Sequence, residues 1–141
     1  MPDSVLLDTS VVVAMERGQL PLTTFAGLEV FICGATVAEW LMGAPVKDAG
    51  KQARFQKFWQ AVVSHIPTVA LTNGICEDAG LRLAAARAKG KTITLGDGLH
   101  AAASEWHKYV VATLDLNDFE DLGAKAYNPL KSKYPPRQAA S

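Results

Sequence analysis

The sequence predicts an α/β protein: a three-layer α/β/α sandwich with a central parallel sheet. Three observations predict this class. Short apolar runs alternate along the chain with segments of helical character. These runs are nearly continuous in apolar residues, as is typical of parallel strands covered on both faces. The chain has 141 residues, 49% of them apolar, which suits one domain with a sizeable core.

The first strand is expected in the apolar run at 5–7, which ends at Asp8. The next segment, 9–17, is rich in valine, but Gly18 and Pro21 close it as they would close a short helix. We therefore expect the chain to begin with a strand that leads directly into a helix.

The second strand is expected at 30–33, and a helix over 35–42 follows it and ends at Gly43. The helix after that has the clearest amphipathic pattern. Its apolar face recurs at i, i+3, i+4, i+7 and i+8 and consists of Phe55, Phe58, Trp59, Val62 and Val63. At that spacing the aromatic side chains are expected in the core rather than on a surface that stacks bases.

The second half of the chain continues the alternation. A strand at 65–71 precedes a helix over 72–89 that Gly90 ends. A short extended link leads to another helix, which opens at Asp97. The last two strands are expected at 109–112 and 124–127. Right-handed crossovers between such strands give the three-layer arrangement.

The composition narrows the class of protein. Fourteen basic residues balance fourteen acidic ones, so no net field attracts the chain to nucleic acid or to a membrane. We recognise no signal peptide and no membrane span, and Cys33 and Cys76 are too far apart for a zinc knuckle. A cytoplasmic protein with two buried free cysteines is expected. The domain is predicted at 1–128, with a proline-rich basic tail at 129–141.

Four acidic residues, Asp8, Glu39, Asp97 and Asp115, follow the predicted strands or open the next helix. Open parallel sheets bind ligands outside the carboxyl ends of their strands, so these acids can approach one edge. Each also has a local explanation: helix caps for Asp8 and Asp97, a capping box from Thr36 to Glu39, and an Asx turn at Asp115. Within about 4–6 Å of one another, carboxylates repel by about 3–4 kcal/mol per pair, which favours a cation. An oxygen-only site of this kind suits Mg²⁺ or Mn²⁺.

Four short motifs follow one another along the chain. They are Asp8-Thr9-Ser10-Val11, Ala38-Glu39, Asp97 with His100-Ala101-Ala102, and Thr113-Leu114-Asp115-Leu116-Asn117-Asp118-Phe119. In this order and spacing they resemble the motifs of the PIN-domain family. The single-domain length is similar to that of VapC-type toxins of toxin–antitoxin pairs. The resemblance runs from residue 5 to about residue 127 and implies a PIN-like version of the predicted sandwich.

The resemblance implies a Mg²⁺- or Mn²⁺-dependent endoribonuclease that hydrolyses structured RNA such as tRNA or rRNA. Such proteins usually form homodimers and are silenced by a cognate antitoxin. The implied catalytic acids are Asp8, Glu39, Asp97 and Asp115, of which Asp8 and Asp97 would be the metal ligands. The implied supporting residues are Ser10, Thr113 and Asp118. Asp118 could equally close a turn, and His100 is expected on a helix face bonded to its neighbours, with a position facing the site as the alternative.

Two other functions share features of this sequence with the nuclease. A phosphoacceptor receiver domain has the same layers and an acidic magnesium pocket, but it needs paired acids after the first strand, and here Thr9 follows Asp8. A PIN-like domain that binds RNA or protein without cutting would be expected to lack one or more of the four acids.

Two groups of basic residues are open to both a functional and a structural interpretation. They are Lys47, Lys51, Arg54 and Lys57 in one helix, and Arg82, Arg87, Lys89 and Lys91 at the end of another. Either group could hold RNA phosphates or form a solvated helix face. Trp40, Leu41 and Met42 could line a partner groove or pack in the core.

Overall fold

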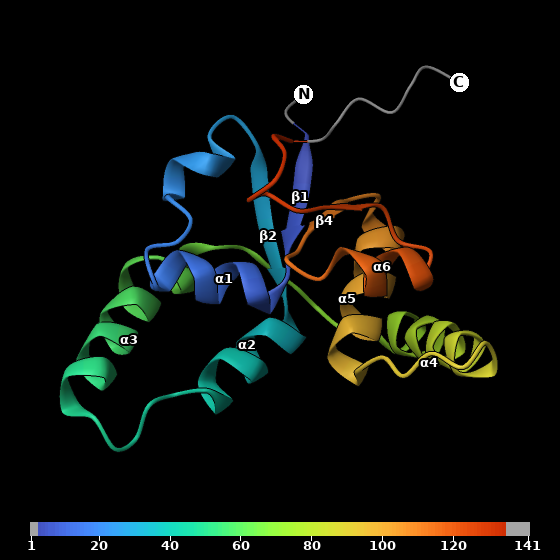
Figure 1. Cartoon of the computed structure of the whole chain (residues 1–141), viewed down its shortest axis with the longest axis horizontal. Helices are drawn as coiled ribbons and strands as arrows, with labels where there is room; N and C mark the ends of the chain where they lie inside the picture. The colour runs from blue at the N-terminus through green and yellow to red at the C-terminus, as the bar shows by residue number, and fades with distance from the viewer. Residues whose placement is uncertain (1–2, 135–141) are drawn as a thin grey trace.

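A computed structural model, which describes residues 3–134, contains one sheet of five parallel strands in the order β3-β2-β1-β4-β5. The strands are β1 (Ser4–Leu7), β2 (Glu29–Cys33), β3 (Thr68–Val69), β4 (Val110–Ala112) and β5 (Ala126–Tyr127). Strand β1 lies at the centre, where Val5 pairs with Val30 of β2 on one side and with Val110 of β4 on the other. The predicted parallel sheet is therefore confirmed (Figure 1).

Six α-helices and two short 3₁₀ helices connect the strands in the described part of the chain. They are α1 (Thr9–Glu16), α2 (Gly34–Met42), α3 (Ala49–Ala61), α4 (Asn73–Ala88), α5 (Leu95–His107), α6 (Leu116–Asp121), η1 (Leu22–Phe25) and η2 (Val63–His65). Helix α1 packs on one face of the sheet, and α4 and α5 pack on the other. This arrangement is the predicted three-layer sandwich.

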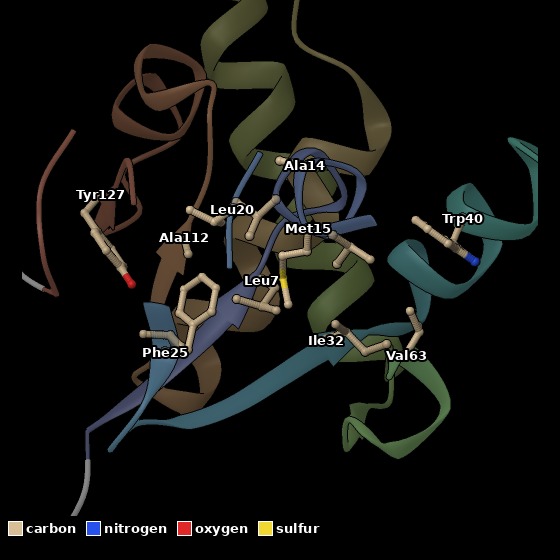
Figure 2. Packing of buried hydrophobic residues seen from close by; sticks show 13 residues of the cluster. Leu7, Ala14, Met15, Leu20, Phe25, Ile32, Trp40, Val63, Ala112 and Tyr127 are labelled. Carbon is tan, nitrogen blue, oxygen red and sulfur yellow. The ribbon is translucent and has the colours of Figure 1, made fainter. Parts of the chain in front are cut away.

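The alternation of side chains along β1 divides the core between the two faces. Val5 and Leu7 point into a cluster with Met15 of α1, whereas Leu6 belongs to the cluster with α4 and α5. Figure 2 shows the first cluster, which extends from Tyr127 along the sheet to Trp40. Side chains that alternate in direction along an all-apolar strand thus anchor helices on both faces of the sheet.

Helices α4 and α5 approach each other closely at two glycines. A Cβ atom on Gly74 of α4 would lie 2.5 Å from the ring of Trp106, and one on Gly98 of α5 would lie 2.5 Å from Leu83. Larger residues at these positions would force the two helices apart. This close packing fixes the position of the start of α5, and therefore of Asp97, relative to the sheet.

Three predicted details were wrong. The strand predicted at 65–71 shortens to Thr68–Val69, because Pro67 has no N–H to donate and η2 takes up His65. Helix α5 begins at Leu95 rather than at Asp97, because the Thr94 hydroxyl caps it by accepting from the Asp97 N–H. Cys33 is buried as expected, but Cys76 is exposed.

The aromatic face of α3 is only half-buried, against the expectation of a core position. Phe55 stacks on Trp40 of α2, with ring centroids 4.5 Å apart, and Phe58 meets the same indole at a tilt, with centroids 5.5 Å apart. Trp59 also stays half-buried, and no residue of α3 is fully buried. The helix packs at the margin of the domain, against α2, so its inner face meets one aromatic side chain instead of the sheet.

The predicted tail at 129–141 lies partly outside the described residues, since residues 135–141 are not among them. Within the described part, Tyr134 packs edge-on against Tyr127, with ring centroids 5.4 Å apart. The division of the chain at residue 128 stays a prediction. Within residues 3–134, no helix has both the length and the apolar content to cross a membrane.

Candidate active site

The carboxyl ends of β1 and β4 meet where the direction of strand succession reverses, which is where open α/β sheets bind their ligands. Asp8 follows β1 directly, and its N–H donates to the carbonyl of Ala112 at 2.9 Å. Thr113 follows β4, and its hydroxyl donates to Oδ2 of Asp8 at 2.9 Å. Two segments 105 residues apart thus place their polar side chains at one point.

Asp8 is both a helix cap and the buried centre of this site. Its Oδ1 accepts from the Thr9 N–H at 2.9 Å, and so caps α1. Its Oδ2 accepts from the hydroxyls of Ser10, at 2.8 Å, and Thr113. Ser10 and Thr113 therefore hold the carboxylate from two sides, in the positions expected of supporting residues. The cap and the site are compatible roles for one side chain.

Asp97, Asp115 and Asp118 form an acidic cluster beside Asp8, with one carboxylate oxygen of each lying within 4.8 Å of the others. Burial and repulsion from Asp8 raise the pKa of Asp97 to about 7, although His100 opposes the rise. A hydrogen bond with the side chain of Asp118, together with burial, raises the pKa of Asp115. These carboxyl groups are crowded enough to favour a bound proton or cation. Only a supporting role was expected for Asp118, but its carboxylate is one of the three that make up this cluster.

Glu39 reaches the same edge of the sheet from the middle of α2. Its Oε1 accepts from the Thr9 hydroxyl at 2.8 Å, and its carboxylate lies against Gly96, the residue before Asp97. The capping box expected from Thr36 to Glu39 is absent, because α2 begins at Gly34, so that Thr36 lies within its first turn. The Thr36 hydroxyl instead contacts the Thr9 hydroxyl at 3.0 Å.

His100 lies beneath the acidic residues and is completely buried. Its Nδ1 is 2.7 Å from the carbonyl of Gly96, its Nε2 is 2.6 Å from the hydroxyl of Thr36, and Nε2 is 3.9 Å from Oδ1 of Asp8. Burial alone would lower the pKa of His100, but contacts with Cys33, Asp8 and Gly96 raise it to about 9. The sequence favoured a helix-face histidine. The position three residues after Asp97, on the next turn of the same helix face, was the available signal.

The donor set fits a hard divalent cation. Five carboxylates (Asp8, Glu39, Asp97, Asp115 and Asp118) converge here, and the surrounding groups are hydroxyls, backbone and the imidazole of His100. The Lys and Arg ion pairs of residues 3–134 join Arg54 to Glu16, Arg82 to Asp78 and Lys91 to Asp121, all outside this group. Oxygen ligands without a neutralising lysine or arginine suit Mg²⁺ or Mn²⁺.

A groove of about 570 Å³ runs from Glu39 between α1, α2 and α3. Its lining includes Val13, Trp40, Phe55 and the basic residues Lys51 and Arg54. The indole Nε1 of Trp40 is covered by the domain and has no hydrogen-bond partner among the described residues. The groove is thus a partly apolar surface, bordered by basic residues, beside the acidic site.

The two groups of basic residues differ in how strongly their side chains are held by contacts within the domain. Lys51 and Arg54 border the groove, and Arg54 pairs with Glu16 at 2.9 Å. Arg82 is committed to the fold, since it pairs with Asp78 at 3.0 Å and donates to the carbonyl of Leu122 at 2.8 Å. Because its guanidinium group already has these partners, Arg82 is not a candidate for holding RNA.

Comparisons with known proteins agree with this geometry. The family model described as PIN domain matches residues 5–125. No curated protein sequence is similar enough to this chain to count as a relative. Among solved structures, FitAcB from Neisseria gonorrhoeae is similar, with 23% identity, a TM-score of 0.70 and coverage of 89% of this chain and 97% of that chain.

Two further structures share the fold. A DNA-bound VapBC from Salmonella typhimurium has 20% identity and a TM-score of 0.75, over 92% of this chain and 99% of that chain. VapC20 from Mycobacterium tuberculosis, described as a toxin that cleaves the sarcin–ricin loop, has 15% identity and a TM-score of 0.63, over 85% and 95% of the two chains. The whole described sandwich, and not a fragment of it, is therefore shared.

Proposed function

This chain belongs to the PIN-domain family, and from that premise we propose that it is a metal-dependent endoribonuclease, the toxin of a cytoplasmic toxin–antitoxin pair. The observation that carries the proposal is the convergence of acids from four separate segments at one edge of the sheet. Asp8 follows β1, Glu39 lies on α2, Asp97 on α5, and Asp115 and Asp118 follow β4. Such a group, without a lysine or arginine to neutralise it, serves a cation better than it serves the fold.

In this proposal Asp8 and Asp97 hold a Mg²⁺ or Mn²⁺ ion, and Glu39, Asp115 and Asp118 complete its acidic surroundings. A bound ion supplies positive charge for a phosphate oxygen and acidifies a water molecule. Ser10 does not act as a nucleophile, because its hydroxyl donates to Asp8 and accepts from the Leu114 N–H at 3.2 Å. The reaction class is therefore hydrolysis of a phosphodiester without a covalent intermediate.

For the substrate we propose structured RNA, such as tRNA or rRNA. The site is open on the solvent side, where Asp115 is exposed, and Lys51 and Arg54 border the groove that leads to Glu39. Basic residues beside an acidic metal site can hold phosphates on either side of the bond that is cut. The similar VapC20 is described as cleaving the sarcin–ricin loop, which supports a structured RNA target.

We also propose two protein partners: a cognate antitoxin and a second copy of this chain. Similar structures are described as a toxin–antitoxin complex from Klebsiella pneumoniae and as VapBC-5 from Mycobacterium tuberculosis, a member of the VapBC family of toxin–antitoxin systems. In this chain the groove beside Glu39 offers an apolar lining that includes Val13, Trp40 and Phe55. An apolar antitoxin segment would fill the groove and block the path to the acidic residues.

The direct test is cleavage of total RNA by the purified protein with Mg²⁺ or Mn²⁺, followed by sequencing of the RNA ends. We expect cuts at a few defined positions in structured RNA, and no cuts in EDTA. Cleavage that persists in EDTA would contradict the metal mechanism. Metal-independent RNA binding without any cut would favour the alternative, a PIN domain that binds and does not cleave.

A further inference from the structure

We propose that His100 is a positioning residue that fixes the carboxylate of Glu39 through the hydroxyl groups of Thr36 and Thr9. The inference rests on the proposed function, because that function is what gives the carboxylate of Glu39 a role in the acidic surroundings of a metal ion. It concerns residues on three elements, α1, α2 and α5, that meet only in the folded chain.

The four side chains form a continuous series of short contacts. His100 Nε2 is 2.6 Å from Thr36 Oγ1, and Thr36 Oγ1 is 3.0 Å from Thr9 Oγ1. Thr9 Oγ1 is in turn 2.8 Å from Oε1 of Glu39. Thr36 and His100 are completely buried, so water does not compete for the bond between them. The series therefore connects the base of α5 with the carboxylate at the open edge.

The direction of every bond follows from counting protons. A carboxylate only accepts, so the single hydroxyl proton of Thr9 goes to Glu39. Thr36 must then donate its own proton to Thr9, and it has none left for His100. His100 Nε2 therefore donates to Thr36. Nδ1 also donates, because its partner is the carbonyl of Gly96 at 2.7 Å.

Gly96 closes the series into a ring. Its carbonyl anchors the imidazole of His100, and its Cα side lies against the carboxylate of Glu39. A Cβ atom there would lie 2.7 Å from Oε2 of Glu39. The same turn of α5 thus holds both ends of the series, and it also carries Asp97. The geometry couples the position of Glu39 to that of Asp97.

A second feature distinguishes His100 from an ordinary core histidine. In residues 3–134 it is the one basic side chain in an ion-pair contact with the acidic group, through Asp8 at 3.9 Å. A core histidine needs only satisfied nitrogens. This one donates one proton to the Gly96 carbonyl and the other to the Thr36 hydroxyl, and its ring lies beside a group of carboxylates that has no lysine or arginine.

The experiment compares Thr36→Val, which is isosteric but has no hydroxyl, with Thr36→Ser, which keeps it. Mn²⁺ affinity is measured by calorimetry, RNA cleavage is measured on total RNA, and melting in EDTA confirms that each variant folds. We expect Thr36→Val to lose about tenfold or more in Mn²⁺ affinity, and Thr36→Ser to restore most of that loss. Thr9→Val and Thr9→Ser form a second pair with the same expectation.

A double mutant separates positioning from general packing. If Thr36 acts through Glu39, Thr36→Val has no further effect on Mn²⁺ affinity in a Glu39→Gln background. Full additivity of the two effects, or equal Mn²⁺ affinity of the Val and Ser variants, overturns the inference. If the wild type still binds Mn²⁺ and cleaves RNA, the proposed function is unaffected by that result. Wild-type protein that neither binds Mn²⁺ nor cleaves RNA overturns the proposed function, and the positioning role with it.

Discussion

Gly96 and Glu39 are in such close contact that no side chain fits between them. A Cβ atom on Gly96 would lie 2.7 Å from Oε2 of Glu39 and 3.1 Å from the carboxyl carbon. Gly96 stands in the first turn of α5, where its backbone does not require glycine for a left-handed conformation. The absence of a side chain at this position therefore serves the carboxylate of Glu39 and not the helix.

Gly96→Ala should weaken Mn²⁺ binding and RNA cleavage by about tenfold to a hundredfold, because the new methyl group displaces the carboxylate of Glu39. The free energy of unfolding should change by less than about 1 kcal/mol, since alanine favours the helix and the end of a glutamate can move. Calorimetry with Mn²⁺ and melting in EDTA measure the two effects. The control is Gly80→Ala on α4, where nothing lies within 4 Å of a new Cβ. Unchanged Mn²⁺ affinity in Gly96→Ala would contradict the role given to Glu39.

Asp97→Asn and Asp8→Asn should both abolish RNA cleavage, because each removes one negative charge from the proposed metal site. Their metal-free stabilities should differ. Asp97→Asn relieves repulsion and should melt at or above the wild-type temperature near neutral pH. Asp8→Asn should cost about 1 kcal/mol, because both oxygens of Asp8 accept hydrogen bonds and an amide nitrogen cannot accept.

The matched control for these two variants is Asp121→Asn, which removes an exposed carboxylate paired with Lys91 and leaves the acidic group intact. It should cleave RNA like the wild type. Full activity in Asp97→Asn or Asp8→Asn would show that the carboxylate serves only as a local structural group.

The sequence predicted the order of the elements because that order depends on local patterns. Each strand is an apolar run, and the alternation within 5–7 already assigns Leu6 and its neighbours to opposite faces. The lengths were less predictable. The short β3 depends on the missing N–H of Pro67, and the half-buried face of α3 depends on its packing at the margin of the core, where Trp40 lies.

The acids that the structure brings together could be identified from the sequence because Asp8 and Asp115 follow strands, Asp97 lies in the first turn of a helix, and Glu39 lies on the helix that follows β2. The contacts that connect them could not. Thr36 and His100 are 64 residues apart, and only the packing of α2 on α5 makes them neighbours. Locally, Thr36 and Glu39 have the spacing of a capping box, which the earlier start of α2 at Gly34 overrides. The roles of Ser10, Thr113 and Asp118 stay predictions until the variants are measured.

Gly98→Ala tests the packing that fixes the height of α5. A Cβ at this buried position would lie 2.5 Å from the side chain of Leu83 on α4. Overpacking of this kind costs about 1–3 kcal/mol, and the better helix propensity of alanine returns up to about 1 kcal/mol. A net loss of about 1–2 kcal/mol in the free energy of unfolding is expected by urea denaturation. Stabilisation equal to that of Gly80→Ala would mean that α4 and α5 separate without cost.

The pH dependence of the metal-free protein should reveal the ionisation of Asp97. Its pKa of about 7 in the folded chain lies above its ordinary value of 3.8, so the folded state holds this proton more tightly than the unfolded state does. The stabilisation is complete below the lower pKa and is lost as the pH rises through the higher one. In EDTA, the melting temperature of the wild type should therefore fall between about pH 5 and about pH 8 relative to that of Asp97→Asn.

The comparison with Asp97→Asn removes the ionisation of Asp97 and keeps His100, whose pKa is about 9, in both proteins. A bound cation competes with the same proton, so Mn²⁺ affinity of the wild type should rise across the same window with release of a proton. Calorimetry in two buffers of different ionisation enthalpy counts that proton. Parallel melting profiles for the two proteins, with no proton released on binding, would mean that Asp97 is already ionised at pH 5 and that the carboxylates are less crowded than their geometry indicates.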